Sequence, residues 1–272
     1  MAPGLLWVGL LLALPCALIF VTAFYQRGLY GGVNWSAATL ENFSRAGEWL
    51  YVRIFLDSAR VAGLATVLAL VIGYPAAYAI SRARPGLQTA LLFLAILPFW
   101  TNYLIRTYAW MVLLNREGLI NGALRGAGVI DEPLPLLYNE FAVVLGLVYN
   151  YTPFVILAVY SSLQRLDASY AEASRDLGAG PWTTFWRITL PLTASGVAAG
   201  AVFVFVLSIG NFLTPDLLGG GKMTMAGNLI YDQFLKARDW PFGSALAAVL
   251  IGLMMALLLI QAWMQRRVRQ TG

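Results

Sequence analysis

Six long apolar runs define the pattern of hydrophobic and polar positions along the chain. A helix needs about 20 mostly apolar residues to cross a bilayer, and each run reaches about that length. The six spans are predicted at Leu5–Tyr25, Ala59–Ile80, Thr89–Leu114, Phe141–Ser162, Leu192–Pro215 and Ser244–Met264. The pattern predicts an all-α, polytopic membrane protein in which residues 1–272 form one transmembrane domain.

The first run, Leu5–Tyr25, is the one that a signal peptide would resemble. It has no basic region before it and no obvious cleavage site, and it is longer than the apolar core of a signal peptide. We therefore expect it to remain in the protein as the first span.

Composition supports a membrane protein and removes several function classes. Of 272 residues, 60% are hydrophobic and 11% are charged, whereas soluble domains average about 25% charged residues. The chain has no histidine and one cysteine, Cys16. This argues against histidine-ligated metal sites, against Ser-His or Cys-His catalysis and against a disulfide within the chain.

The net charge of +5 would suit nucleic-acid binding, but the distribution of charge points to membrane topology instead. With both termini inside, the inner face holds eight arginines and three acids, and eight minus three equals the whole net charge. These residues are Arg82, Arg84, Arg165, Arg175, Arg187, Arg266, Arg267 and Arg269, with Asp167, Glu172 and Asp176. Because cytoplasmic loops carry an excess of basic residues, we predict that the termini and the loop 164–191 are cytoplasmic, with no nucleic-acid partner.

The loop 164–191 carries the densest charge in its half of the chain. Ser169 and Glu172 form a Ser-x-x-Glu capping box, which predicts a helix start near Ser169. Gly178 is placed to end that helix in a left-handed conformation. Pro181 suits the first turn of a second helix, and Pro191 should end it because proline disfavours helical geometry at the preceding residue. Apolar side chains should hold the second helix at the membrane surface; they are Trp182, Phe185, Trp186 and Ile188.

The spacing of this loop resembles the "EAA" loop of permeases from binding-protein-dependent ABC importers. The matching residues are Glu172, Ala173, Gly178, Ile188, Leu190 and Pro191, and Ser174 replaces the second alanine of the pattern. The resemblance implies a coupling helix that docks on a cytosolic ATPase through Glu172, Ala173, Ser174, Gly178 and Trp182. The alternative is an ordinary cytoplasmic loop with a capped helix.

Polar residues interrupt three of the predicted spans. Pro98 should kink the third span, where Asn102 and Arg106 share one face. A charge at this depth should face a cavity or a partner, unless Arg106 reaches the outer interface by snorkelling. Tyr149 and Asn150 interrupt the fourth span, and Ser208, Asn211 and Thr214 interrupt the end of the fifth. Such breaks line cavities or serve helix–helix hydrogen bonds.

Three further stretches narrow the resemblance to the first permease of spermidine/putrescine-type importers. They are Gly73–Tyr78, Leu97–Trp110 and Asn211–Gly220, within a likeness that covers about residues 66–234. The resemblance implies a second, homologous permease, a dimer of cytosolic ATPases that binds the ATP, and a periplasmic or lipid-anchored solute-binding protein. The permease itself should then bind no cofactor.

A glycine-rich segment near the end of the fifth span, Gly219-Gly220-Gly221-Lys222, is not a phosphate-binding loop, because Asp216 and Met223 break that pattern. We expect it to be a flexible loop.

A polyamine route should offer aromatic faces and a few polar acceptors. Residues of this kind near the expected midplane and outer half are Trp100, Tyr103, Tyr149, Asn150 and Asn211, with Asp216 at the entrance. Arg106 would repel a cation unless an acid of the second permease neutralises it. An anionic or zwitterionic solute, such as an amino-acid-like or phosphonate compound, is therefore the alternative.

Two other function classes fit the sequence less well. An intramembrane enzyme would need a nucleophile and a base within the membrane, and the chain offers no histidine and no lysine in a predicted span. A stand-alone secondary transporter would more often show inverted repeats and acids at mid-span, which the sequence does not display.

Single cysteines at Ser169 and Ala127, in a Cys16→Ala background, should report the orientation. Because the arginine asymmetry places Ser169 inside and Ala127 outside, an impermeant thiol reagent should label only the Ala127 variant in intact cells. Permeabilised cells are the control in which both variants should react. Labelling of the Ser169 variant in intact cells would contradict the orientation.

Overall fold

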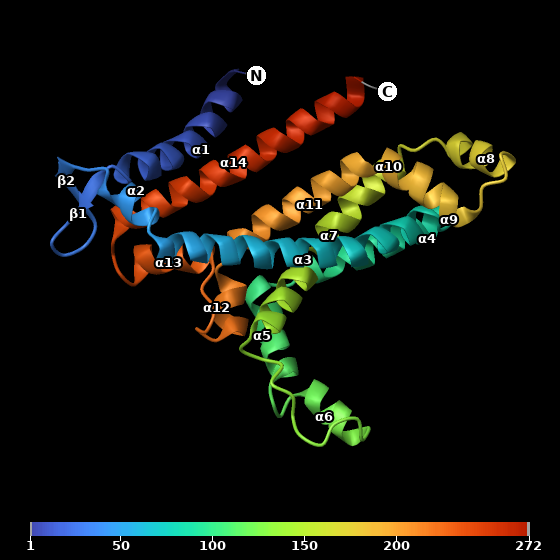
Figure 1. Cartoon of the computed structure of the whole chain (residues 1–272), viewed down its shortest axis with the longest axis horizontal. Helices are drawn as coiled ribbons and strands as arrows, with labels where there is room; N and C mark the ends of the chain where they lie inside the picture. The colour runs from blue at the N-terminus through green and yellow to red at the C-terminus, as the bar shows by residue number, and fades with distance from the viewer. Residues whose placement is uncertain (1, 271–272) are drawn as a thin grey trace. The chain divides into compact units, whose positions relative to one another are not determined.

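The computed structural model describes residues 2–270, which are mostly helical. Figure 1 shows the elements. The longer helices are α1 (Ala2–Thr22), α3 (Trp49–Ser81), α4 (Pro85–Ile96), α5 (Tyr103–Leu114), α7 (Glu140–Leu163), α11 (Ala194–Ile209), α13 (Ala226–Leu235) and α14 (Trp240–Gln270). The shorter elements are β1 (Tyr25–Arg27), β2 (Val33–Ala38), α2 (Glu41–Ala46), the 3₁₀-helix η1 (Leu97–Trp100), α6 (Leu119–Gly126), α8 (Ala168–Asp176), α9 (Pro181–Thr184), the π-helix η2 (Phe185–Thr189), α10 (Leu190–Leu192) and α12 (Leu213–Gly219).

The described residues contain three helices that are long and apolar enough to cross a membrane, and five if each of two bent pairs is one span. The three are Trp49–Ser81, Glu140–Leu163 and Trp240–Trp263. The bent pairs are Pro85–Trp100 with Tyr103–Gly126, and Pro181–Leu192 with Ala194–Ile209. Helix α1 adds a shorter apolar stretch, Gly9–Thr22. The structure therefore supports a protein with several spans, and the number six stays a prediction.

The third predicted span, Thr89–Leu114, is not one continuous helix. Its two halves meet at an angle of 89°. Pro98 lies in the 3₁₀-turn η1, and the backbone is extended at Thr101 and Asn102. The Asn102 side chain then accepts a hydrogen bond from Leu104 N–H at 2.8 Å and so begins α5. A break replaces the expected kink, because Pro98 disrupts regular hydrogen bonding and Asn102 caps a new helix.

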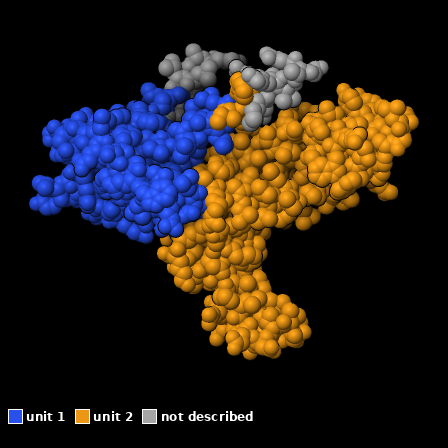
Figure 2. All heavy atoms as spheres, viewed as in Figure 1, with its two compact units in different colours: residues 1–58, 210–212, 224–259 blue, residues 59–209, 213–223, 260–272 orange. Residues whose placement is uncertain are grey.

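The described residues form two compact units, which Figure 2 distinguishes by colour. The first unit comprises residues 1–58, 210–212 and 224–259, and the second comprises 59–209, 213–223 and 260–272. Helices α3 and α14 each contribute to both units. The single transmembrane domain expected from the sequence stays a prediction.

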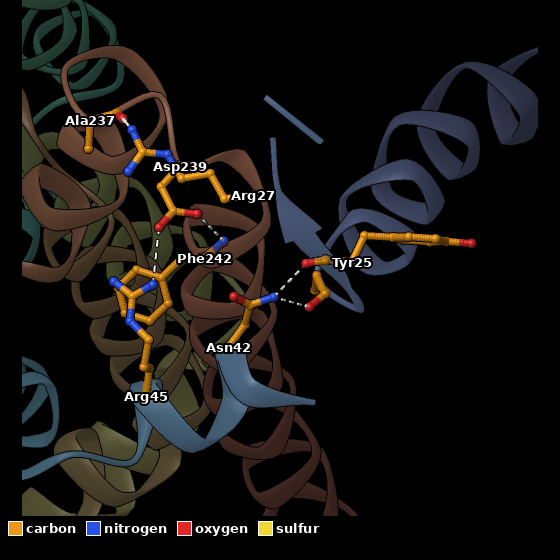
Figure 3. A network of polar contacts seen from close by, with 8 residues as sticks. Tyr25, Arg27, Asn42, Arg45, Ala237, Asp239 and Phe242 are labelled. Atoms are coloured by element: carbon orange, nitrogen blue, oxygen red, sulfur yellow. Dashed lines mark hydrogen bonds and ion pairs between the residues drawn. The ribbon is translucent and has the colours of Figure 1, made fainter. Parts of the chain in front are cut away.

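The first unit contains an ion pair between a half-exposed arginine and a buried carboxylate. Arg45 donates to the Asp239 carboxylate at 3.1 Å, and its guanidinium lies 3.8 Å from the centre of the Phe242 ring (Figure 3). Asp239 is 4% exposed and also accepts the Phe242 N–H. A buried carboxylate is stable only when it is paired and hydrogen-bonded, and both conditions are met here.

The β1–β2 hairpin is tied to the same region. The two strands pair antiparallel, and the Asn42 side chain donates to the carbonyls of Ala23 and Tyr25 at 2.9 and 2.8 Å (Figure 3). Arg27 donates to the Ala237 carbonyl at 2.6 Å. The sequence pattern does not predict this hairpin, and one of its contacts, between Arg27 and Ala237, joins residues 210 positions apart in the chain.

Helices α7 and α11 form the core of the second unit and lie side by side (Figure 1). Gly196 on α11 faces α7 so closely that a Cβ atom would lie 2.7 Å from the Ala158 carbonyl oxygen and would also clash with Ser162. A Cβ on Gly73 of α3 would lie 2.7 Å from Val155. The small residues therefore permit the close helix packing that is typical of membrane proteins.

Gly196→Leu should destabilise the second unit, whereas Gly252→Leu should not. The first substitution forces α11 away from α7, and overpacking of this kind costs about 1–3 kcal/mol. Gly252 has open space where its Cβ would be. The measurement is the midpoint of thermal aggregation of each variant in detergent. Equal midpoints for the two variants would contradict the packing.

Candidate functional site

The loop 164–191 folds as a capped helix, but its cap is not the predicted one. Helix α8 begins at Ala168, and the Asp167 carboxylate accepts the Ser169 N–H at 2.9 Å. The predicted capping box, with Ser169 as the cap and Glu172 as its partner, is therefore wrong. Asp167 is the stronger competitor because its charge also suits the positive end of the helix dipole.

Ser169 also affects the titration of the cap. Hydrogen bonds from its backbone N–H and its side chain lower the pKa of the Asp167 carboxyl, because they favour the charged form. The stabilising contribution of the cap is present above the unfolded-state pKa and is lost as the pH falls through the lowered pKa.

The end of α8 confirms the predicted role of Gly178. Its φ is +80°, in the left-handed region. Gly178 N–H donates to the Arg175 carbonyl, and Ala179 N–H donates to the Ser174 carbonyl, which is the pair of bonds of a Schellman motif. Pro181 is the first residue of α9, also as predicted.

Pro191 does not end the second helix, so that prediction is wrong. Leu190 has helical backbone angles, and the helix continues to Leu192. The preceding turn is a π-helix in which Leu190 N–H donates to the Phe185 carbonyl, five residues back. The wider turn makes room for the proline ring, which would otherwise clash with the carbonyl of Arg187.

The residues expected to face an ATPase divide into an exposed group and one buried member. Glu172, Ala173, Gly178 and Trp182 are exposed, and Trp182 is 72% exposed. Ser174 is buried, and its hydroxyl shares a hydrogen bond of 2.9 Å with the Thr184 hydroxyl. Ser174 therefore fixes α8 against α9 rather than forming part of the surface.

The second short helix is anchored to α3 by one aromatic ring. Phe185 makes edge-to-face contacts with Tyr74 and Tyr78, with ring centres 5.6 Å apart in each case. An apolar groove of about 760 Å³ lies beside these rings, between α3 and the second short helix. Trp182 and Trp186 also line it. Phe185 thus connects the loop to a membrane helix, and the membrane-surface position of the remaining apolar side chains stays a prediction.

Arg106, in the first turn of α5, is buried near two aromatic rings. Arg106 is 8% exposed, and its guanidinium carbon lies 5.3 Å from the centre of the Phe99 ring and 5.7 Å from that of Tyr103. Its Nε atom has no hydrogen-bond partner among the residues that the structure describes. This burial disagrees with the snorkelling alternative.

Two further predicted pathway residues, Tyr103 and Asn150, are linked through contacts of Thr214 and Gly146. The Tyr103 hydroxyl hydrogen-bonds to Thr214 of α12, and the Thr214 methyl packs against Gly146 of α7, where a Cβ would lie 2.8 Å from it. One turn further along α7, Asn150 donates to the Gly146 carbonyl at 2.8 Å. Its Oδ1 atom is buried and has no partner within the described part of the chain.

We name Tyr103, Arg106, Asn150 and Thr214 the polar cluster; all four belong to the second unit. The sequence identified these residues as breaks in apolar helices. It missed Phe99 and Gly146, for which the signals were an aromatic residue beside Pro98 and a small residue in an apolar helix.

The other predicted pathway residues lie outside this cluster. Trp100 is 73% exposed and contacts Phe93 at 5.4 Å between ring centres. Tyr149 packs edge-on against Trp110, and Asp216 is exposed on α12. Asn211 is buried in the first unit.

A family model described as "Binding-protein-dependent transport system inner membrane component" matches residues 5–270. The chain belongs to this family. It is thus a multi-pass component of the inner membrane and a transport permease rather than an enzyme. The match confirms the resemblance to ABC importer permeases that the sequence motifs indicate.

Two relatives in this family are named "Spermidine/putrescine transport system permease protein PotB". The protein of Haemophilus influenzae is 40% identical over 256 residues, which cover 93% of this chain and 88% of the relative. The protein of Escherichia coli K12 is 40% identical over 261 residues, which cover 96% and 94%.

A solved structure extends the comparison to the fold. It is a bacterial alginate ABC transporter in complex with alginate pentasaccharide-bound periplasmic protein. One of its chains superposes with a TM-score of 0.78 at 16% identity, over 98% of this chain and 92% of that chain. The permease fold is therefore shared.

Asp167→Ala in this permease should loosen α8 more than Ser169→Ala does. Losing the cap leaves the backbone N–H groups of the first turn without their side-chain acceptor, so the helix start should open more often. The measurement is the rate of trypsin cleavage after Arg175 in the purified protein. Asp167→Asn is the matched control, because asparagine also caps helices. Faster cleavage of Ser169→Ala than of Asp167→Ala would contradict the observed cap.

Proposed function

We propose that this chain is one permease subunit of an ATP-driven importer for polyamines such as spermidine and putrescine, with six membrane spans and both termini in the cytoplasm. The observation that carries the proposal is the 40% identity to the PotB proteins over almost the whole chain. The arginine asymmetry supports the orientation.

The loop 164–191 supplies the coupling helix of this machine. Glu172 and Ala173 lie on the exposed surface of α8, and Gly178 turns the chain directly after it. A cytosolic ATPase dimer docks on this surface and closes when it binds ATP. Phe185 transmits the movement, because it packs against Tyr74 and Tyr78 of α3. The two orientations of the pathway are states whose populations nucleotide and solute shift.

The polar cluster lines this chain's half of the pathway, and a second, homologous permease supplies the other half. The buried Oδ1 of Asn150 is an acceptor that an ammonium group satisfies. The exposed rings of Trp100 and Tyr149 offer faces for cation–π contact, and Asn211 and Asp216 contribute further polar groups. The positive charge of Arg106 requires an acid of the second permease.

A solute-binding protein outside the cell delivers the substrate. The segments that would receive it are 26–58, 115–140 and 216–243. ATP is bound by the partner subunits, and this chain binds no cofactor in this scheme. The alternative substrate is an anionic or zwitterionic solute. The favouring observation is the Nε of Arg106, which has no hydrogen-bond partner among the described residues.

Uptake by the reconstituted complex with its own binding protein tests the substrate. Trp100→Ala and Asn150→Leu should lower spermidine or putrescine uptake about tenfold or more, since losing one contact worth about 1.4 kcal/mol has that effect. Trp7→Ala, at an exposed position of α1, is the matched control and should transport normally.

A different result identifies the alternative substrate. If the binding protein binds no polyamine but binds an anion, and Arg106→Gln abolishes uptake of that anion, the polyamine assignment is wrong. Subunit assembly measured by co-purification ensures that each loss reflects transport.

A further inference from the structure

A small basic pocket lies away from the polar cluster, between the end of α5, the segment before α7 and the turn after α12. Its volume is about 270 Å³. The lining residues are Asn115, Arg116, Pro135, Leu137, Tyr138 and Lys222, and all belong to the second unit. No sequence pattern connects these residues, because Lys222 is more than 100 residues from Arg116.

The pocket carries two positive charges without a counter-charge. Neither Arg116 nor Lys222 forms an ion pair within residues 2–270, whereas Arg45, Arg53, Arg60 and Lys236 each have a carboxylate partner. Pro135 and Leu137 provide apolar walls. Apolar walls lower the local dielectric and so strengthen the attraction of the two cations for an anion.

Buried hydrogen bonds hold the pocket in shape before any ligand arrives. Asn121 is fully buried, and its side-chain nitrogen donates to the carbonyls of Asn115 and Leu134 at 3.1 and 3.0 Å. Its oxygen accepts the Leu134 N–H at 2.9 Å. One amide therefore fixes two walls of the pocket, next to Arg116 on one side and next to Pro135 on the other.

The third wall is held by an unusual backbone conformation. Tyr138 has a φ of +62°, which is rare for a bulky residue. Its N–H donates to the Leu218 carbonyl at 3.0 Å. Gly220, with a φ of +60°, lies against the Tyr138 ring, where a Cβ would clash. The segment 219–222, expected to be a flexible loop, is thus a glycine turn that presents Lys222 to the pocket. Such strain persists at positions where the surroundings over-determine it, and it gathers at binding sites.

We propose that this pocket receives one acidic side chain of the solute-binding protein when that protein docks on the outer face. The volume of about 270 Å³ is ample for one carboxylate side chain. Arg116 can hold a carboxylate through two N–H groups, and Lys222 adds a point charge. The two cations would repel a polyamine, so the pocket is a docking site and not part of the solute pathway.

This inference rests on the proposed function, which places segments 115–140 and 216–243 outside the cell. The test uses the complete transport complex in lipid nanodiscs and its own purified binding protein, labelled with a fluorophore. Affinity is measured at low salt and at high salt, because salt screens exposed charges.

The double variant Arg116→Glu, Lys222→Glu should bind the labelled protein about tenfold or more weakly, a change of about 1.4 kcal/mol in binding free energy. Wild-type binding should weaken at high salt, and the double variant should lose most of that dependence. Arg125→Glu is the matched control, because it reverses a nearby exposed charge that does not line the pocket. Basal ATP hydrolysis without binding protein should be unchanged in all three complexes.

Charge reversal on the binding protein completes the test. One Asp→Lys or Glu→Lys variant of that protein should restore affinity for the double variant and weaken binding to the wild type. Unchanged affinity of the double variant, an equal loss in Arg125→Glu, or loss of permease assembly instead of docking would overturn the pocket assignment. Failure of the wild-type complex to bind any binding protein would overturn the proposed function as well, so the two failures are distinguishable.

Discussion

Backbone polar groups that enter a bilayer need partners within the protein, and side-chain hydrogen bonds supply such partners at three breaks in the helices of this permease. Asn102 caps α5 where the third apolar run breaks. At the bend before α11, the Thr193 hydroxyl donates to the Thr189 carbonyl at 2.7 Å and is also hydrogen-bonded to Tyr74. After α11, Asn228 donates to the Phe212 carbonyl. The breaks are therefore the places where polar chemistry enters an apolar chain.

The same constraint makes the remaining unpartnered atoms informative. Among the described residues, the buried side-chain atoms without a hydrogen bond are Arg106 Nε, Asn150 Oδ1 and Ser208 Oγ. Each such group costs about 1–3 kcal/mol. A transport pathway needs polar groups that can form hydrogen bonds with a passing solute or with a second subunit. Atoms that already have a hydrogen-bond partner within the chain are not available for this.

The coupling role proposed for the loop 164–191 requires stiffness in its short helices. Asp167 begins α8, the left-handed Gly178 ends it, and the Ser174–Thr184 hydrogen bond joins it to α9. The π-turn then carries the helix through Pro191 without interruption. A push on the exposed surface of α8 can therefore reach α3 through packed groups rather than being absorbed by a flexible loop.

The sequence by itself determined the membrane character, the left-handed turn at Gly178 in the loop 164–191, and the family. Apolar length, a left-handed glycine and motif spacing are local properties. Tertiary structure decided that Phe185 packs against Tyr74 and Tyr78 of α3. It also brought Arg116 and Lys222 into one pocket. These outcomes depend on contacts between segments far apart in the chain, which no local pattern encodes.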